Sequence, residues 1–231
     1  MIIWKKIRTG EWIPWTYLLM LVFDLVYNSL VYYGGQWVGT HTKAWNIETS
    51  LDQQIPVIPW FVGIYLSFFL FCTVNFLVMG YFEKKKACLF LCAELLAKTV
   101  CGIFYLCFPT TNLRPEIVGT DFWSQALVGL YQMDAAVNLF PSIHCMASWF
   151  CCIGLRKCKE IPEWYKLMSV LIAISVFIST LATRQHVLWD VAGGIGVAEL
   201  TWFISNRTNG WKTYQRLNEK ISVGISRRLG R

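Results

Sequence analysis

Hydrophobic residues are gathered into six long runs, separated by shorter polar segments. The runs lie at about residues 12–33, 57–82, 87–108, 141–155, 164–183 and 187–206. A helix needs roughly 20 predominantly apolar residues to cross the hydrocarbon core of a bilayer. The fourth run is shorter than this, and we expect it to extend by a residue or two at its inner end. The pattern therefore predicts an all-α, polytopic membrane protein with six transmembrane helices.

The composition agrees with a membrane protein rather than a soluble domain. Of the 231 residues, 55% are hydrophobic and only 15% are charged, whereas soluble domains carry about 25% charged residues. The first hydrophobic run is long and has no small-residue cleavage site, so we expect it to remain as a membrane anchor.

Lysine and arginine residues are distributed unevenly among the segments between the runs. Three lie in residues 1–11, three in 83–86, four in 156–166 and seven from Arg207 onward. The segments 34–56, 109–140 and 184–186 together carry three, and Lys98 lies within a run. Because positively charged segments stay on the cytoplasmic side, we expect both termini in the cytoplasm of a multi-pass protein of the cell membrane.

The same charge distribution bears on partners and on domain organisation. The net charge of +7 predicts contact with anionic lipid, not with nucleic acid. The six runs are predicted to form one domain over residues 1–206. Residues 207–231 alternate basic and apolar positions, which predicts an amphipathic cytoplasmic tail; a frayed basic tail is an equal alternative. Helical spacing of apolar residues also predicts an interfacial helix over 121–131. A homo-oligomer is allowed by the sequence.

The nine cysteines do not form the pattern of a metal site or a disulfide framework. No Cys-x-x-Cys pair is present, and the outer segments 34–56 and 109–140 contain no cysteine. Most of the cysteines lie within hydrophobic runs, where a free thiol behaves as a small apolar side chain. We therefore expect neither a metal nor a cofactor.

Two of the three histidines stand at the outer ends of hydrophobic runs. His186 and Asp190 are four residues apart, which places them on one face of a helix. The carboxylate can then hold one ring nitrogen and leave the other free to attack phosphorus. The alternative is a histidine–aspartate hydrogen bond that serves packing alone.

The second histidine belongs to the segment that opens the fourth run. Pro141 suits the first turn of a helix, so that Ser142 and the amides behind it form an anion site at the helix N-terminus. His144 would reach the same anion and act as the general acid that protonates the leaving oxygen. The alternative is a histidine at the water boundary of an ordinary helix start.

Two arginines, Arg114 and Arg184, lie in the outward segments. A guanidinium group binds two phosphate oxygens at once, so we expect both to bind phosphate. Anchoring to lipid headgroups is the alternative for each. Charged residues also lie within the runs: Asp24, Glu94, Lys98 and Glu199. Glu94 and Lys98 are four residues apart, and for these intramembrane charges we favour structural pairing over catalysis.

These segments resemble, in order, the three signature motifs of the type 2 phosphatidic acid phosphatase superfamily. The motifs are Arg114-Pro115, Pro141-Ser142-Ile143-His144 and the segment from Ser179 to Asp190, so the similarity covers roughly residues 100–200. The resemblance implies a six-helix membrane bundle. It implies that His186 is the nucleophile, that Asp190 orients it and that His144 is the acid. It also implies that Arg114, Ser142 and the backbone of Ile143 bind phosphate.

The sequence departs from the family pattern at three positions. Cys107 stands where the first motif has a lysine, Ile143 replaces the glycine of the second, and Thr180 stands where the third has an arginine. Arg184, two residues before His186, is the expected substitute. The variant motif resembles the branch related to inositol phosphorylceramide and sphingomyelin synthases, which transfers a phosphorylated headgroup.

Three functions follow as hypotheses. The first is a metal-independent lipid phosphatase that hydrolyses a phosphomonoester or diphosphate lipid at the outer leaflet through a phosphohistidine. The second is a phosphotransferase with the same histidine nucleophile and an alcohol acceptor. The third is a transporter or scaffold in which His144, His186 and Asp190 form a proton relay or a packing set. No inverted repeat or broken-helix pair is visible, which disfavours a transporter.

Overall fold

The computed structural model describes residues 13–82 and 84–228, which contain nine helices and one two-stranded parallel sheet. The basic residues of segment 1–11, which are predicted to be cytoplasmic, lie outside this part of the chain. So do the last three residues of the predicted tail.

Each of the six hydrophobic runs contains a helix. These helices are α2 (Trp15–His41), α4 (Phe61–Met79), α5 (Lys84–Cys107), α7 (Ile143–Leu155), α8 (Glu163–Ala182) and α9 (Leu188–Thr208). The remaining elements are β1 (Trp45–Asn46), α3 (Ser50–Gln54), β2 (Thr110–Thr111), α6 (Phe122–Met133) and α10 (Gly210–Arg228).

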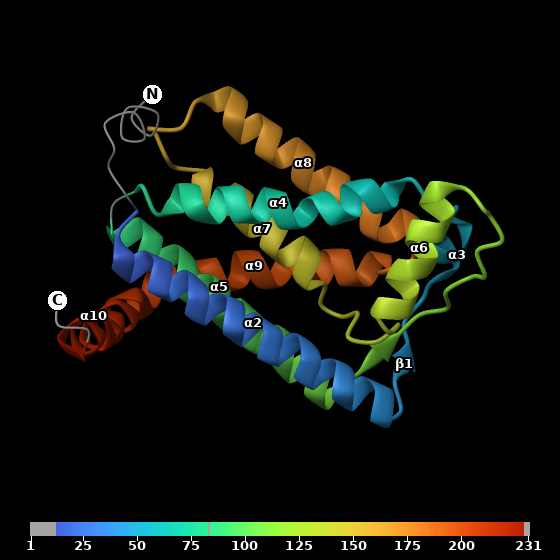
Figure 1. Ribbon diagram of the computed structural model, residues 1–231, viewed down its shortest axis with the longest axis horizontal. Helices are drawn as coiled ribbons and strands as arrows, with labels where there is room; N and C mark the ends of the chain where they lie inside the picture. Colours follow the sequence, from blue (N-terminus) through green and yellow to red (C-terminus); the bar gives the residue numbers. More distant parts are fainter. Residues whose placement is uncertain (1–12, 83, 229–231) are drawn as a thin grey trace.

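The long helices run up and down the length of the molecule (Figure 1). The starts of α2, α5 and α8 lie at one end, and α10 lies at the same end. The small elements α3, α6 and β1 gather at the other end, where α4 and α9 begin, whereas α7 begins nearer the middle of the molecule. The segments between helices therefore alternate between the two ends, as the six-run pattern predicts.

Four of the described helices, α2, α4, α5 and α8, are long and apolar enough to cross a membrane. Helix α9 has 21 residues but includes Asp190, Glu199 and Arg207. Helix α7 has only 13 residues, about 20 Å at 1.5 Å per residue, which is shorter than a hydrocarbon core of about 30 Å. The six-span arrangement and the cytoplasmic termini stay predictions.

Helix α7 differs from the expected fourth span because it lies inside the protein. It packs on α4, α5, α8 and α9, and Cys145, Met146, Phe150 and Ile153 are among its many buried residues. Lipid does not surround this helix, so its length is set by its neighbours rather than by bilayer thickness. It thereby carries Ser142 and His144 into the centre of the bundle.

Helix α2 extends beyond the expected end of the first span at residue 33. Gly34 and Gly35 favour a loop in the sequence, but the helix continues to His41. Two glycines permit close packing there: a Cβ on Gly35 would lie 2.7 Å from the Tyr105 Cβ, and one on Gly39 would lie 2.8 Å from the Val137 Cβ. These glycines therefore serve helix packing, not chain reversal.

The two additional predicted helices are present. Helix α6 begins after Asp121, whose side chain accepts hydrogen bonds from the amides of Trp123 and Ser124, and Leu127 of this helix is fully buried. Helix α10 packs against α5 and α2, so the described part of the tail is helical rather than frayed. Their positions at a membrane surface stay predictions.

Candidate active site

The two histidines of the motifs lie side by side inside the bundle, next to the end where α9 begins. His186 Nε2 is 3.4 Å from His144 Nδ1, and His186 Nδ1 is 3.3 Å from Asp190 Oδ2. His186 is 7% exposed and Asp190 is fully buried. A carboxylate at Nδ1 favours the tautomer that carries its proton there, which leaves the Nε2 lone pair of His186 directed toward His144.

The local structure around α9 positions Asp190. Its Oδ2 atom accepts a hydrogen bond of 2.8 Å from the Val187 amide, so the same carboxylate caps the helix and holds the histidine. The Asp190 carbonyl accepts a hydrogen bond of 3.1 Å from the Ser142 amide. Gly194, one turn farther along, brings the two helices together, because a Cβ there would lie 2.6 Å from the Ser142 carbonyl oxygen.

Ser142 and Ile143 occupy the start of α7, but Pro141, which is expected in the first turn, precedes the N-cap and lies outside the helix. Ser142 is the N-cap, and its Oγ accepts a hydrogen bond of 3.2 Å from the Cys145 amide. Ser142 is fully buried, whereas Ile143 lines the cavity described below together with His144. The roles of Ser142 and of the Ile143 amide in phosphate binding stay predictions.

Tyr65 of α4 is a site residue that the motifs do not indicate. Its hydroxyl lies 2.9 Å from His144 Nε2, on the side of the ring opposite His186. The Tyr65 and Phe68 rings lie 4.7 Å and 4.8 Å from the His144 ring, centroid to centroid. Tyr65, His144, His186 and Asp190 therefore form a continuous chain of polar contacts, enclosed by aromatic rings.

Arg114 and Gln185 lie together beside the histidines. One Arg114 nitrogen donates to Gln185 Oε1 at 2.9 Å, another donates to the Asp134 carbonyl, and the guanidinium lies 4.8 Å from the centre of the Tyr131 ring. Burial lowers the pKa of Arg114, and the nearby Asp134 carboxylate opposes that shift. An arginine stays protonated in this setting and offers positive charge to the site.

Two buried donors of this pair are left without a partner. Across the described chain, Arg114 Nε and Gln185 Nε2 donate to no acceptor. Both side chains line the same cavity as His144 and His186. Because unpaired buried donors are costly, their presence here favours an anion as the group that completes the site. Sequence reasoning missed Gln185, although it directly precedes His186.

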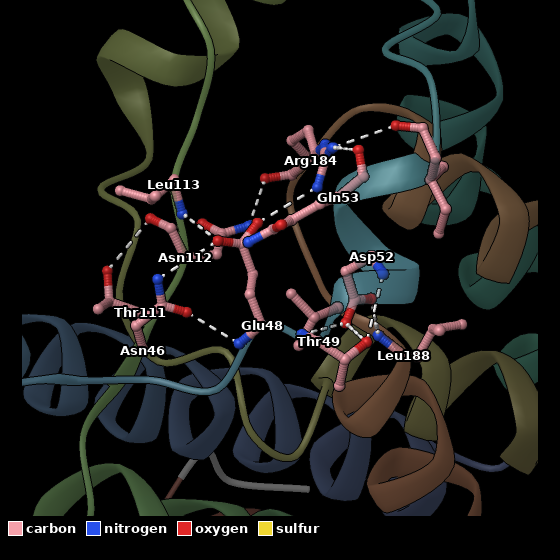
Figure 2. A network of polar contacts seen from close by, with 12 residues as sticks. Asn46, Glu48, Thr49, Asp52, Gln53, Thr111, Asn112, Leu113, Arg184 and Leu188 are labelled. Carbon is pink, nitrogen blue, oxygen red and sulfur yellow. Dashed lines mark hydrogen bonds and ion pairs between the residues drawn. The ribbon is translucent and has the colours of Figure 1, made fainter.

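Arg184 is engaged elsewhere (Figure 2). Its guanidinium donates to Glu48 Oε1 at 3.2 Å and to the carbonyls of Gln53 and Ile55 at 3.3 Å and 3.1 Å. Glu48 also accepts from the Leu113 amide at 3.2 Å. Arg184 thus ties together three segments between helices, and the structure does not bring it into contact with the histidine pair. Its expected contact with phosphate stays a prediction, which the Glu48 ion pair disfavours.

Asp52 of α3 attaches the same outer layer to α9 (Figure 2). Its Oδ1 accepts a hydrogen bond of 2.8 Å from the Leu188 amide, in the first turn of α9. Burial raises the pKa of Asp52, but hydrogen bonds from Thr49 and from the Leu188 amide outweigh this and lower it overall. A charged Asp52 at this helix N-terminus stabilises the turn that follows His186.

A cavity of about 640 Å³ extends from the histidines into the bundle. Its walls come mainly from α2 and α4. Four of its lining residues, Leu25, Tyr33, Leu66 and Phe69, are also exposed on the apolar outer surface. The cavity therefore opens sideways between α2 and α4, on a surface suited to hydrocarbon, and its size is that of a pocket for a drug-sized ligand.

Comparison with known proteins decides the family. A model described as the PAP2 superfamily matches residues 32–204, which is more than half of the chain. The chain belongs to the PAP2 superfamily, the type 2 phosphatidic acid phosphatases. No match was found among curated proteins or among solved structures.

Membership agrees with the geometry of the site. The PAP2 superfamily generally comprises phosphatases and phosphotransferases, and the chain is consistent with a lipid phosphatase-type function in a membrane. The matched region includes all the motif residues, from Arg114 to Asp190. In this member of the superfamily the structure brings together Arg114, His144, His186 and Asp190, and it adds Tyr65 and Gln185.

Proposed function

We propose that the protein is an integral-membrane lipid phosphatase that hydrolyses a phosphomonoester or diphosphate lipid at the outer leaflet through a phosphohistidine. The observation that carries this proposal is the contact chain of Asp190, His186 and His144 at one end of the cavity. The reaction is proposed to need no metal, since the guanidinium of Arg114 supplies positive charge to the phosphate.

In the first step, His186 Nε2 attacks phosphorus while the bond from phosphorus to the lipid oxygen breaks. The leaving oxygen takes a proton from His144 Nδ1 and departs as an alcohol from a phosphomonoester, or as a lipid monophosphate from a diphosphate. Asp190 stabilises the positive charge that develops on His186. In the second step, water attacks the phosphohistidine, His144 takes a proton from that water, and inorganic phosphate leaves His186.

Arg114 and Gln185 are proposed to bind the phosphate oxygens through their unpaired donors, with Ser142 and the Ile143 amide as further ligands. We propose a different role for Arg184. Its ion pair with Glu48 fixes the position of the segment that carries Gln185 and His186.

Phosphotransfer to an alcohol is the second candidate, supported by the variant motif Phe140-Pro141-Ser142-Ile143-His144. It shares the first step and differs only in the acceptor of the second. Adding a lipid alcohol to the assay separates the two functions: transfer yields a new phospholipid, and hydrolysis yields only free phosphate.

The test is release of phosphate from phosphatidic acid, phosphatidylglycerophosphate and a polyprenyl diphosphate, by the purified protein in excess chelator. We expect release from at least one lipid. With labelled substrate and alkaline work-up, which preserves phosphohistidine, wild type should retain label and His186→Ala should retain none.

His41 supplies the matched control. It is an exposed histidine at the end of α2, stacked on Trp37 away from the cavity lining. His41→Ala should keep both turnover and label. Label that persists in His186→Ala would contradict a nucleophilic role for this residue.

A further inference from the structure

Three charged side chains meet at the deep end of the cavity. Lys98 Nζ lies 2.7 Å from Asp24 Oδ2 and 2.9 Å from Glu94 Oε1. All three residues are at most 4% exposed and line the same cavity as His144. The pairing of Glu94 with Lys98 confirms the expectation from their spacing, but the pairing alone leaves the position of this cluster on the cavity wall unexplained.

Some acceptor atoms of the cluster receive no hydrogen bond from a donor group. Asp24 Oδ1 and Glu94 Oε2 are buried and receive no hydrogen bond from a donor group in residues 13–82 or 84–228, and the two carboxyl groups lie within hydrogen-bonding reach of each other. The cluster also contains two carboxyl groups and one ammonium group. Unpaired acceptors inside a membrane protein are costly, and charges at this depth are rare without a function. A ligand that donates hydrogen bonds would complete the cluster.

The cluster lies about two helical turns below the phosphate end of the cavity. Tyr105 lies at the depth of the phosphate end, because its hydroxyl donates to the Pro141 carbonyl beside Ser142. Lys98 precedes Tyr105 by seven residues, a distance of about 10 Å along α5. On α2, Asp24, Asn28 and Tyr32 line the cavity at intervals of four residues, and Tyr32 donates to Asp134 near Arg114.

The opposite wall of the cavity is mainly apolar. It is formed by α4, with Leu66, Phe68, Phe69 and Phe76. A lipid chain in this cavity would therefore contact hydrocarbon on one side and a polar stripe on the other. A purely hydrocarbon chain would leave the carboxylate oxygens of Asp24 and Glu94 unpaired.

We infer that Asp24, Glu94 and Lys98 form a second polar subsite, which binds a hydroxyl or amino group on the hydrocarbon part of the lipid, about 10 Å from its phosphate. The group donates to the free oxygens of Asp24 and Glu94, and a hydroxyl can in turn accept from Lys98. This inference rests on the proposed function for the phosphate end. It names the substrate class: a lipid phosphate with a hydrogen-bond donor on its chain.

A series of alkyl phosphates measures the depth of the subsite directly. With carbon–carbon bonds of about 1.5 Å, a zigzag chain needs roughly eight carbons to span about 10 Å. We compare dodecyl phosphate with its 2-hydroxy, 8-hydroxy and 8-amino derivatives. The 8-hydroxy or 8-amino compound should lower KM about tenfold, the effect of one hydrogen bond to a charged group, and the 2-hydroxy compound should not.

A purely structural ion pair predicts the opposite result. An 8-hydroxyl group would then be desolvated without a partner, and KM would rise. A KM for the 8-substituted compounds equal to or above that of dodecyl phosphate therefore overturns the inference.

Variants assign the effect to the cluster. Glu94→Gln and, independently, Asp24→Asn should each remove most of the preference for the 8-substituted compounds. Glu199→Gln is the matched control, because Glu199 is also a charged residue of a long helix but pairs with Arg156 and Trp149 instead of lining the cavity. It should keep the preference. Preference retained in both Glu94→Gln and Asp24→Asn contradicts the assignment.

Binding without turnover separates the subsite from the proposed function. Dodecylphosphonate and 8-hydroxydodecylphosphonate cannot be hydrolysed at the carbon–phosphorus bond, and their affinity can be measured from thermal stabilisation of the purified protein. Tighter binding of the hydroxy compound supports the subsite even if no phosphate lipid is hydrolysed. Equal binding overturns it even if hydrolysis is observed.

Discussion

At the residue scale, the two outward arginines differ in their surroundings. Arg114 is half-buried, contacts Gln185 and lines the cavity, with its Nε unpaired in the described chain. Arg184 has φ of 52°, the left-handed region that favours glycine, and its guanidinium is occupied by Glu48. Identical side chains therefore have different expected roles, one in binding phosphate and one in holding a turn.

Conservative substitutions should separate these roles. Arg114→Lys loses the planar fork that binds two oxygens, and we expect KM to rise about 10- to 100-fold, the cost of one or two charge-assisted hydrogen bonds. Arg184→Lys should change KM less than about threefold but lower the thermal unfolding temperature, since it weakens the contact with Glu48. Steady-state kinetics and unfolding curves in one detergent measure both. A rise in KM for Arg184→Lys as large as that for Arg114→Lys would restore phosphate binding to Arg184.

How far the sequence predicts the site depends on which contacts are local. The contact of His186 with Asp190 follows from their separation of four residues on one helix, and His144 could be placed at the same depth from its position at a run end. Tyr65 could not be predicted, because its contact with His144 joins residues 79 positions apart. The bond between Arg114 and Gln185 spans 71 positions, so no sequence period reveals it.

At the element scale, the crossing of α7 and α9 positions the catalytic groups. Gly194 of α9 faces the backbone of Ser142 and Met146 at the start of α7, where a Cβ would lie 2.6 Å from a carbonyl oxygen and 3.0 Å from an amide nitrogen. Backbone atoms cannot rotate aside as a side chain can. The separation of the two helices, and with it the distance between His144 and His186, is therefore set by this glycine.

Gly194→Ala should destabilise the protein by about 1–3 kcal/mol, the usual cost of overpacking a dense interior. It should also lower turnover, because the helices must move apart. Gly196→Ala, two residues along the same helix, meets nothing within 4 Å and should be neutral or stabilise by about 0.5–1 kcal/mol, the advantage of alanine over glycine in a helix. Thermal unfolding in detergent measures both variants, and equal effects would contradict the role of the crossing.

The hydrophobic pattern predicts that the helices exist, but it does not predict their lengths or ends. Hydrophobic runs predict the six helices because apolar length is a local property. The 13-residue length of α7 and the extension of α2 to His41 depend on neighbours that the pattern does not contain. Gly35 and Gly39 favour a loop by composition but lie in a helix because Tyr105 and Val137 pack against them.

At the scale of the whole molecule, charge and architecture agree. The segments at the end where α2, α5, α8 and α10 begin include most of the basic residues, such as Lys84, Lys85, Arg156 and Lys157. The opposite end holds α3, α6 and the start of α9, which follows His186 directly. Because basic segments remain cytoplasmic, we expect the histidine pair to face away from the cytoplasm.

Cysteine labelling in intact cells tests this orientation. Val118 lies in the outer segment and is 85% exposed, and Lys85 is exposed at the other end. In a Cys107→Ser background, which removes the exposed native thiol, Val118→Cys should react with an impermeant maleimide and Lys85→Cys should react only after permeabilisation. The reverse pattern would invert the topology.

The sideways opening of the cavity between α2 and α4 has a kinetic consequence. A substrate that enters through this opening never leaves the bilayer, so the relevant concentration is its mole fraction among the lipids of one leaflet and not its amount per volume of buffer. Encounter becomes diffusion in two dimensions. Diluting the substrate with inert lipid or detergent at constant bulk concentration should therefore slow the reaction, whereas adding more water should leave the rate per enzyme molecule unchanged.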